Sequence, residues 1–204
     1  MATPSSRRLE ADAAQIGRLV DGLFRYAEEG TFISFRAFDQ HERGRPPVFI
    51  EPEEVNGNLG RIAARAVALA TKAANTKAPA VFAPPIATFK TAISASMADL
   101  ANGVALSVEL DAGDTTLARR RLEHLLGPAT LVVASGGEWS DPDTGEVHPK
   151  LHLHWRLNEP TRTADEHALL TEARWLATTL ANGDRTGVPP CHPLRWPGSW
   201  HRNG

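Results

Sequence analysis

The sequence predicts a mixed α/β (α+β) fold in which a ferredoxin/RRM-like split βαβ half, at residues 104–204, packs against an N-terminal α/β half, at residues 1–103. Three observations predict this fold. The second half reads as strand, helix, strand, strand, helix, which is the order of such a unit. Apolar residues recur at helical or strand spacing in both halves. A length of 204 residues with 42% hydrophobic content is enough for a sizeable core.

The N-terminal half alternates between helical and extended patterns. Apolar or alanine residues at helical spacing predict the helices, and alternation of apolar with polar residues predicts the strands. We expect helices at 9–29 and 61–75, and strands at 31–38, 48–50 and 80–83. Prolines at positions 84 and 85 end the last of these strands.

The second half has the clearer pattern. We expect strands at 104–110, 129–134 and 150–157, and helices at 115–126 and 164–181. Thr163 is the expected N-cap of the second helix. Turn-forming residues between 135 and 150 predict a hairpin or an extended loop. A short final segment, 194–196, would complete the unit.

The composition narrows the function classes. The formal charge is −2, from 22 basic and 24 acidic side chains, so the basic surplus typical of nucleic-acid-binding proteins is missing. A local basic groove is still compatible with this total. The single cysteine, Cys191, excludes an internal disulfide and a cysteine-rich zinc site. The sequence contains neither a secretory segment nor an apolar run long enough to span a bilayer, and we therefore expect a cytoplasmic protein without membrane contact.

The first candidate site is VALSVELDAGD, where an alternating apolar strand ends in two acids. Glu109 and Asp111 are two residues apart, so on a strand both carboxylates face one side, about 6–7 Å apart. Like charges this close repel each other unless cations neutralise them, and Mg²⁺ or Mn²⁺ prefers such oxygen ligands. The pattern is typical of a two-metal phosphoryl-transfer site, although a strand end whose acids face solvent has the same sequence.

The second candidate site is the strand KLHLHW. Lys150, His152 and His154 share one face of this strand, and three apolar residues take the other. A lysine and a histidine aimed at one point suit a triphosphate, because both donate hydrogen bonds to phosphate oxygens. A solvated strand face is the alternative interpretation.

The third candidate site is the loop CHPLRWPGSWHRN. Pro197 and Gly198 predict a tight turn, and Arg195 just before it can offer several donors to phosphate or ribose oxygens. His201 follows the turn. A purely structural arginine is the simpler interpretation, but so many Arg, His and Trp residues in one loop favour binding.

The order and spacing of the three motifs resemble the archaeo-eukaryotic primase superfamily, most closely the RepB-like primase-polymerases of plasmids and phages. The match spans roughly 104–202 and rests on Glu109-Leu110-Asp111, on Ser135-Gly136-Gly137 followed by His152, and on Leu194-Arg195-Trp196-Pro197-Gly198-Ser199. The sequence departs from that pattern in three ways. The acidic pair is Glu-x-Asp, a dozen residues separate Gly137 from Lys150, and His201 stands where asparagine is usual.

The resemblance implies a template-directed DNA primase/polymerase that uses Mg²⁺ or Mn²⁺. Glu109 and Asp111 would bind the metals, with Asp184 or His192 as the candidate third ligand, and His152 would act in the catalytic site. Lys150, His152, Arg195 and Ser199 would bind the nucleoside triphosphate. A single-stranded DNA template would lie on a local groove, with Arg36, Arg43, Arg45 and the tryptophans as candidate contacts. The resemblance further implies that residues 1–204 are the N-terminal part of a longer protein with a fused or associated helicase.

Two other functions remain open from the residues alone. His152-Leu153-His154 also fits the two-histidine motif of Rep and relaxase (HUH-type) endonucleases, which cut DNA with a tyrosine. Tyr26, the one tyrosine of the chain, would then be the nucleophile. A non-catalytic nucleic-acid-binding module on the same ferredoxin-like unit is the other alternative.

Overall fold

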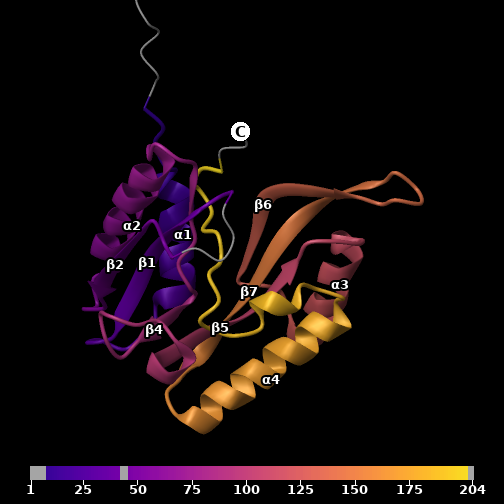
Figure 1. The fold of residues 1–204 in the computed structure, drawn as a ribbon. Coiled ribbons are helices and arrows are strands. Elements are labelled where there is room, and N and C mark those ends of the chain that lie inside the picture. Colours follow the sequence, from indigo (N-terminus) through magenta and orange to yellow (C-terminus); the bar gives the residue numbers. More distant parts are fainter. Residues whose placement is uncertain (1–7, 42–45, 202–204) are drawn as a thin grey trace, which may run out of the picture.

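A computed structural model describes residues 8–41 and 46–201 as a mixed α+β fold around one seven-stranded sheet (Figure 1). The strands are β1 (Phe32–Asp39), β2 (Phe49–Glu54), β3 (Ala80–Phe82), β4 (Ala87–Phe89), β5 (Leu100–Leu110), β6 (Leu131–Ser140) and β7 (Val147–Thr161). Their order is β2-β1-β4-β5-β7-β6, with β3 also paired to β1, and each of these pairs is antiparallel. The expected fold class is confirmed.

Two pairs of helices cover different parts of this sheet. Helices α1 (Ala13–Phe24) and α2 (Leu59–Ala74) lie beside β1 and β2, whereas α3 (Thr115–Leu126) and α4 (Ala164–Leu180) lie beside β5 and β7 (Figure 1). Short 3₁₀ helices occur at η1 (Met97–Asp99) and η2 (Arg185–Gly187). No helix among the described residues combines the length and the apolar character needed to cross a membrane.

The larger hydrophobic core joins the N-terminal half to the end of the chain. Trp196, which is 1% exposed, packs its ring against Phe24, Phe35 and Phe82 at centroid distances of 5.8, 5.6 and 5.7 Å. Tilted and edge-on aromatic pairs of this kind add to the free energy gained from burial. The loop after residue 188 is therefore fixed by the N-terminal core.

The second half forms β5-α3-β6-β7-α4 in the spatial order β5-β7-β6, as in a split βαβ unit. Helix α3 has the predicted bounds, because Asp114 caps it by accepting from Leu117 N and Gly127 follows its end at φ +79°. Thr163 caps α4 as predicted, and Glu166 completes a capping box with it. The predicted hairpin is formed by the long, extended ends of β6 and β7.

Several predicted bounds differ from the structure; helix α1, for example, ends at Phe24 rather than at residue 29. Two of the differences have a clear local cause. Residues 194–196 do not continue the unit as a strand: Leu194 N and Trp196 N donate to Pro84 O and Phe82 O, so this segment follows the N-terminal half instead. Prolines at 189, 190, 193 and 197 lack the N–H groups that a sheet ladder needs. Helix α1 begins at Ala13 rather than at Leu9. Asp12 is its N-cap, because the Asp12 side chain accepts a hydrogen bond from Gln15 N.

Candidate active site

Three carboxylates converge at the end of β5. Glu109 is the second-to-last residue of β5, Asp111 follows the end of that strand, and Asp184 lies just before η2. Each offers one oxygen, and these oxygens all lie within 4.8 Å of one another. Glu109 and Asp111 are the acidic pair that the sequence indicated. Asp184, one of the two candidates for a third ligand, lies beside them.

The open edge of β5 explains why Asp184 reaches this pair. Strand β4 pairs with β5 only near its start, between Leu100 and Gly103. Along the remaining edge the backbone N–H of Asp184 donates to Glu109 O at 2.9 Å. Gly183 permits this approach, because a Cβ there would lie 2.5 Å from the same carbonyl oxygen. A Cβ at Gly187 would overlap Oε1 of Glu109.

Glu109 is held in an environment that disfavours its charge. The side chain is 11% exposed, and Oε1 is buried without a hydrogen-bond partner. Burial, and then repulsion by Asp111 and Asp184, raises the pKa of Glu109 to about 8. His192 Nε2 lies 3.4 Å from Oε1, but burial lowers the pKa of His192, so the neutral imidazole forms no ion pair there.

The donor set fits a divalent cation. Three carboxylates supply only hard oxygen atoms, which suits Mg²⁺ or Mn²⁺. The unpartnered Oε1 of Glu109 and the raised pKa of its carboxyl both indicate that the protein's own side chains do not fully neutralise this carboxylate. The neutral His192 beside this oxygen is a further potential ligand or a hydrogen-bond donor to one.

Arg174 is a part of this site that the sequence interpretation missed. It is 1% exposed on α4; Nη2 donates to Gly187 O at 2.6 Å, whereas Nε and Nη1 have no partner. Burial lowers the pKa of Arg174 to about 10, so the group stays cationic, and its charge favours the ionised form of Glu109. A signal was present, because an arginine occupies a core position between Leu170 and Ala177 on α4.

The two histidines of β7 have different surroundings. Pairing of β5 with β7 sets His152 opposite Glu109 and His154 opposite Ser107. His152 is 5% exposed with Nδ1 unpartnered, and burial, then Arg195, lowers its pKa to about 4. His154 is fully buried and Nδ1 lies 2.9 Å from Ser107 Oγ; burial lowers its pKa to about 3. His154 is therefore a buried side chain of the core, whereas His152 lies near Arg195 and His192 at the acidic site.

A bulge in β6 at residues 135–137 contacts both Arg195 and Lys150. The register shifts between Ala134 and Glu138, so residues 135–137 lie opposite Lys150 alone. Gly136 has φ +80°, and the Lys150 stem lies across Gly137, where a Cβ would be 2.9 Å from Cδ. Arg195 Nη1 donates to Ser135 O, and Nε is buried without a partner. The charge of Asp111 acts on Arg195, which links the bulge to the acidic cluster.

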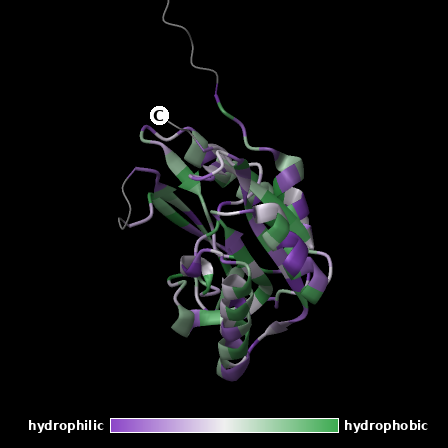
Figure 2. Ribbon diagram, turned by 90° about the vertical axis from the view of Figure 1, so that its right-hand side faces the viewer, coloured by the Kyte–Doolittle hydropathy of each residue, from purple (hydrophilic) through white to green (hydrophobic). Residues whose placement is uncertain are grey.

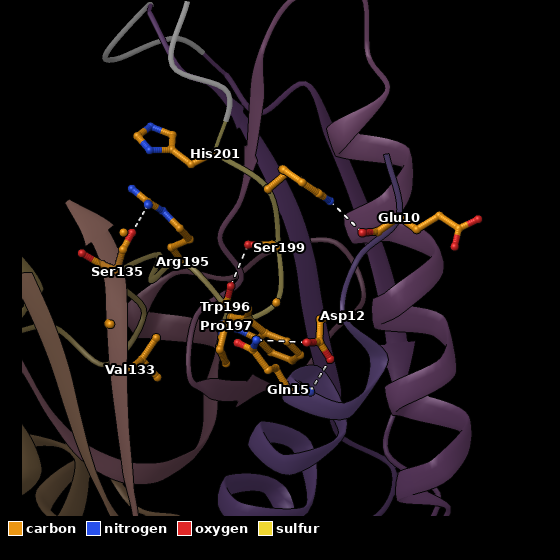
Figure 3. A pocket seen from close by; sticks show the side chains of 14 residues that line it. Glu10, Asp12, Gln15, Val133, Ser135, Arg195, Trp196, Pro197, Ser199 and His201 are labelled. Atoms are coloured by element: carbon orange, nitrogen blue, oxygen red, sulfur yellow. Dashed lines mark hydrogen bonds between the residues drawn. The ribbon is translucent and has the colours of Figure 1, made fainter. Parts of the chain in front are cut away.

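A groove of about 400 Å³ opens on the other side of Arg195 (Figure 3). One wall is the bulge at Ser135 and Gly136, and the opposite wall is the start of α1 with Asp12 and Gln15. The turn at Pro197–Gly198 forms its base, and His201 projects above Arg195. Ser199 also lines the groove, but its Oγ donates to Trp196 O at 2.6 Å and so closes the turn.

The remaining candidate contacts are spread over the N-terminal half. Arg36 lies half-buried on β1, where Nε donates to Ser34 Oγ at 2.9 Å. Arg43 and Arg45 lie outside the described residues. Tyr26 follows α1, is 44% exposed, and has the Arg156 guanidinium 4.8 Å above its ring.

The fold is similar to that of a primase-polymerase AEP domain of known structure. The structure matches the AEP domain of the primase-polymerase of cyanophage S-2L with a TM-score of 0.58, over 95% of this chain and 85% of that chain. The two sequences are 17% identical, so the likeness establishes the fold alone. The sequence matches no protein-family model and no curated protein.

Proposed function

We propose that this chain is the catalytic domain of a template-directed DNA primase-polymerase, with Glu109, Asp111 and Asp184 holding its divalent metals. The observation that carries the proposal is the convergence of these three carboxylates within an AEP fold: Glu109 on β5, Asp111 just after it, and Asp184 from the loop before η2. Acidic groups that repel each other in a partly buried site are ionised together more readily when a cation is bound between them.

The residues around the acids would bind and orient the incoming nucleoside triphosphate. When bound, Mg²⁺ or Mn²⁺ supplies Lewis-acid stabilisation to the attacking and leaving oxygens. His152 is neutral near pH 7, because its pKa is about 4, and so donates one N–H to a phosphate oxygen without charge. Arg195, oriented by Ser135 O, offers its remaining N–H groups to the phosphates, and Lys150 adds a positive charge.

The test is a primer-synthesis and primer-extension assay on single-stranded DNA with Mg²⁺ or Mn²⁺. Asp184→Asn should reduce extension by at least about a hundredfold, as should the double variant Glu109→Ala/Asp111→Ala, because each removes charge stabilisation from the transition state. Asp143→Asn, at the exposed tip of the hairpin, is the matched control and should extend normally. Wild-type activity in Asp184→Asn would remove Asp184 from the metal site.

The proposal extends to replication of a plasmid, phage or other mobile element. The template strand would follow a local basic groove that includes Arg36, and the protein would act together with a helicase. Phosphate contacts release bound counterions, so template affinity should fall steeply between about 50 and 200 mM salt. An affinity that is independent of salt would contradict the groove.

The environments of His154 and Tyr26 do not favour the HUH-type endonuclease. That mechanism needs both histidines on one metal, whereas His154 is fully buried against Ser107. A nicking assay that traps a covalent phosphotyrosine adduct, absent in Tyr26→Phe, would reverse this preference. Calorimetry that finds strand binding without any metal binding would instead favour the non-catalytic module.

A further inference from the structure

Helices α3 and α4 expose an apolar surface on the side of the molecule away from α1 and α2. We call the α3–α4 surface the five leucines Leu125, Leu126, Leu169, Leu176 and Leu180, which are 44–67% exposed. On α4, Leu169, Ala173, Leu176 and Leu180 follow helical spacing and form one stripe. The core-facing stripe of α4 is a different one, containing Leu170 and Ala177. In Figure 2, which views the molecule from this side, the ribbon of α4 at the lower centre carries apolar residues interspersed with polar ones.

The stripe borders two adjoining hollows, of which the smaller is entirely apolar. A hollow of about 130 Å³ between α3 and α4 is lined only by apolar side chains, with Leu106 and Leu122 among them. A second hollow, of about 320 Å³, shares Leu106 and Ala173 with the first and is lined at its far end by Glu159, Arg162 and Glu166. The exposed leucines amount to on the order of 500 Å² of apolar surface, at the upper end of what a monomeric protein shows in one patch. This is more than half of one partner's share of a standard interface of about 800 Å².

Charged residues near this surface are divided between the two helices. Arg120 and Arg121 are exposed on α3, Asp165 is exposed in the first turn of α4, and Glu172 is exposed at the middle of α4. None of these four side chains forms an ion pair within the described part of the chain. The end of α3 borders the C-terminal half of α4, since Leu125 and Leu126 share the smaller hollow with Leu176 and Leu180.

We propose that the α3–α4 surface binds a second copy of this chain, with the two α4 helices antiparallel. A two-fold axis near Ala173 and Leu176 would set Leu169 of one copy against Leu180 of the other. The same axis would bring the acidic N-terminal half of each α4 toward the basic α3 of its partner. One surface is then complementary to itself in both shape and charge, which an interface with a two-fold axis requires. This inference does not depend on the proposed enzymatic function.

Sedimentation velocity on the purified chain, from about 1 to 200 µM, tests whether a dimer forms. A modest interface of this area is expected to associate at micromolar concentrations. Wild type should sediment as a concentration-dependent dimer. Leu176→Glu, at the centre of the stripe, should be monomeric throughout. Ile50→Glu is the matched control, because Ile50 is an exposed apolar residue of β2, remote from α3 and α4, and it should dimerise like wild type. Circular dichroism establishes that both variants fold.

Charge reversal tests the antiparallel arrangement itself. Arg120→Glu/Arg121→Glu makes both helices acidic, and Asp165→Lys/Glu172→Lys makes both helices basic. Each variant alone should dimerise at least about tenfold more weakly than wild type, since like charges then meet at two symmetric places. An equimolar mixture should form heterodimers of near wild-type affinity. A wild-type chain that stays monomeric, a dimer unchanged by Leu176→Glu, or a mixture no tighter than its components would each overturn the proposal.

Discussion

Replacing Glu109 by glutamine should stabilise the metal-free protein at neutral and alkaline pH. The folded pKa of this carboxyl is about 8, against 4.5 for the free side chain, because burial and two neighbouring carboxylates disfavour its charge. For an acid with a raised folded pKa, the folded state holds a proton that the unfolded state has released. Stability therefore falls as pH rises from about 4.5 to about 8 and then stays level.

The raised pKa sets the size of this effect. One pKa unit corresponds to about 1.36 kcal/mol, so ionisable Glu109 destabilises the metal-free fold by on the order of 3 kcal/mol near pH 7. Glutamine keeps the shape of the side chain and cannot ionise. In a domain of this size such a difference raises the midpoint of thermal unfolding by roughly 6–12 °C.

The assay is thermal or urea unfolding in a chelator across pH 5 to pH 8.5, repeated with Mn²⁺ or Mg²⁺. Wild type should lose stability with rising pH and regain it when metal is added, because ligand binding to the folded state alone stabilises it. Glu109→Gln should be insensitive to both, and the control Asp143→Asn should follow wild type. Parallel pH curves for wild type and Glu109→Gln, or equal stabilisation of both by metal, would refute the reasoning.

Three further substitutions test the surroundings of this carboxyl and of the nucleotide. Gly187→Ala should abolish metal-dependent extension without unfolding the protein, because the added Cβ overlaps Glu109 Oε1; Gly17→Ala, which meets open space on α1, should be silent. Arg174→Met should shift the acidic limb of the pH–rate profile to higher pH, since it removes the cation that favours ionised Glu109, whereas Arg174→Lys should shift it less. Arg195→Lys should raise the KM for nucleotide about tenfold with a smaller effect on kcat, because lysine lacks the planar fork of donors.

Local patterns were sufficient to predict most of the elements. Helix α3 and the start of α4 came out as expected, because caps and helical periodicity depend on residues within four positions of each other. The alternation in β5 and β7 also predicted which side chains of each strand share a face, and the pairing of the two strands then sets Glu109 opposite His152. Three-residue β4 was not anticipated, since so short a segment carries no periodicity.

Only the tertiary structure decided which distant segments meet. Asp184 joins the acidic pair because β5 has an open edge that its backbone N–H can pair with, and residues 135–137 bulge toward Arg195. Residues 194–196 pack against the N-terminal half because Trp196 enters the aromatic core there. Sequence periodicity states which face of an element is buried, but the partner of that face depends on packing among segments far apart in the chain. The acids on β5 were thus readable from the sequence, and the site they form was a consequence of the fold.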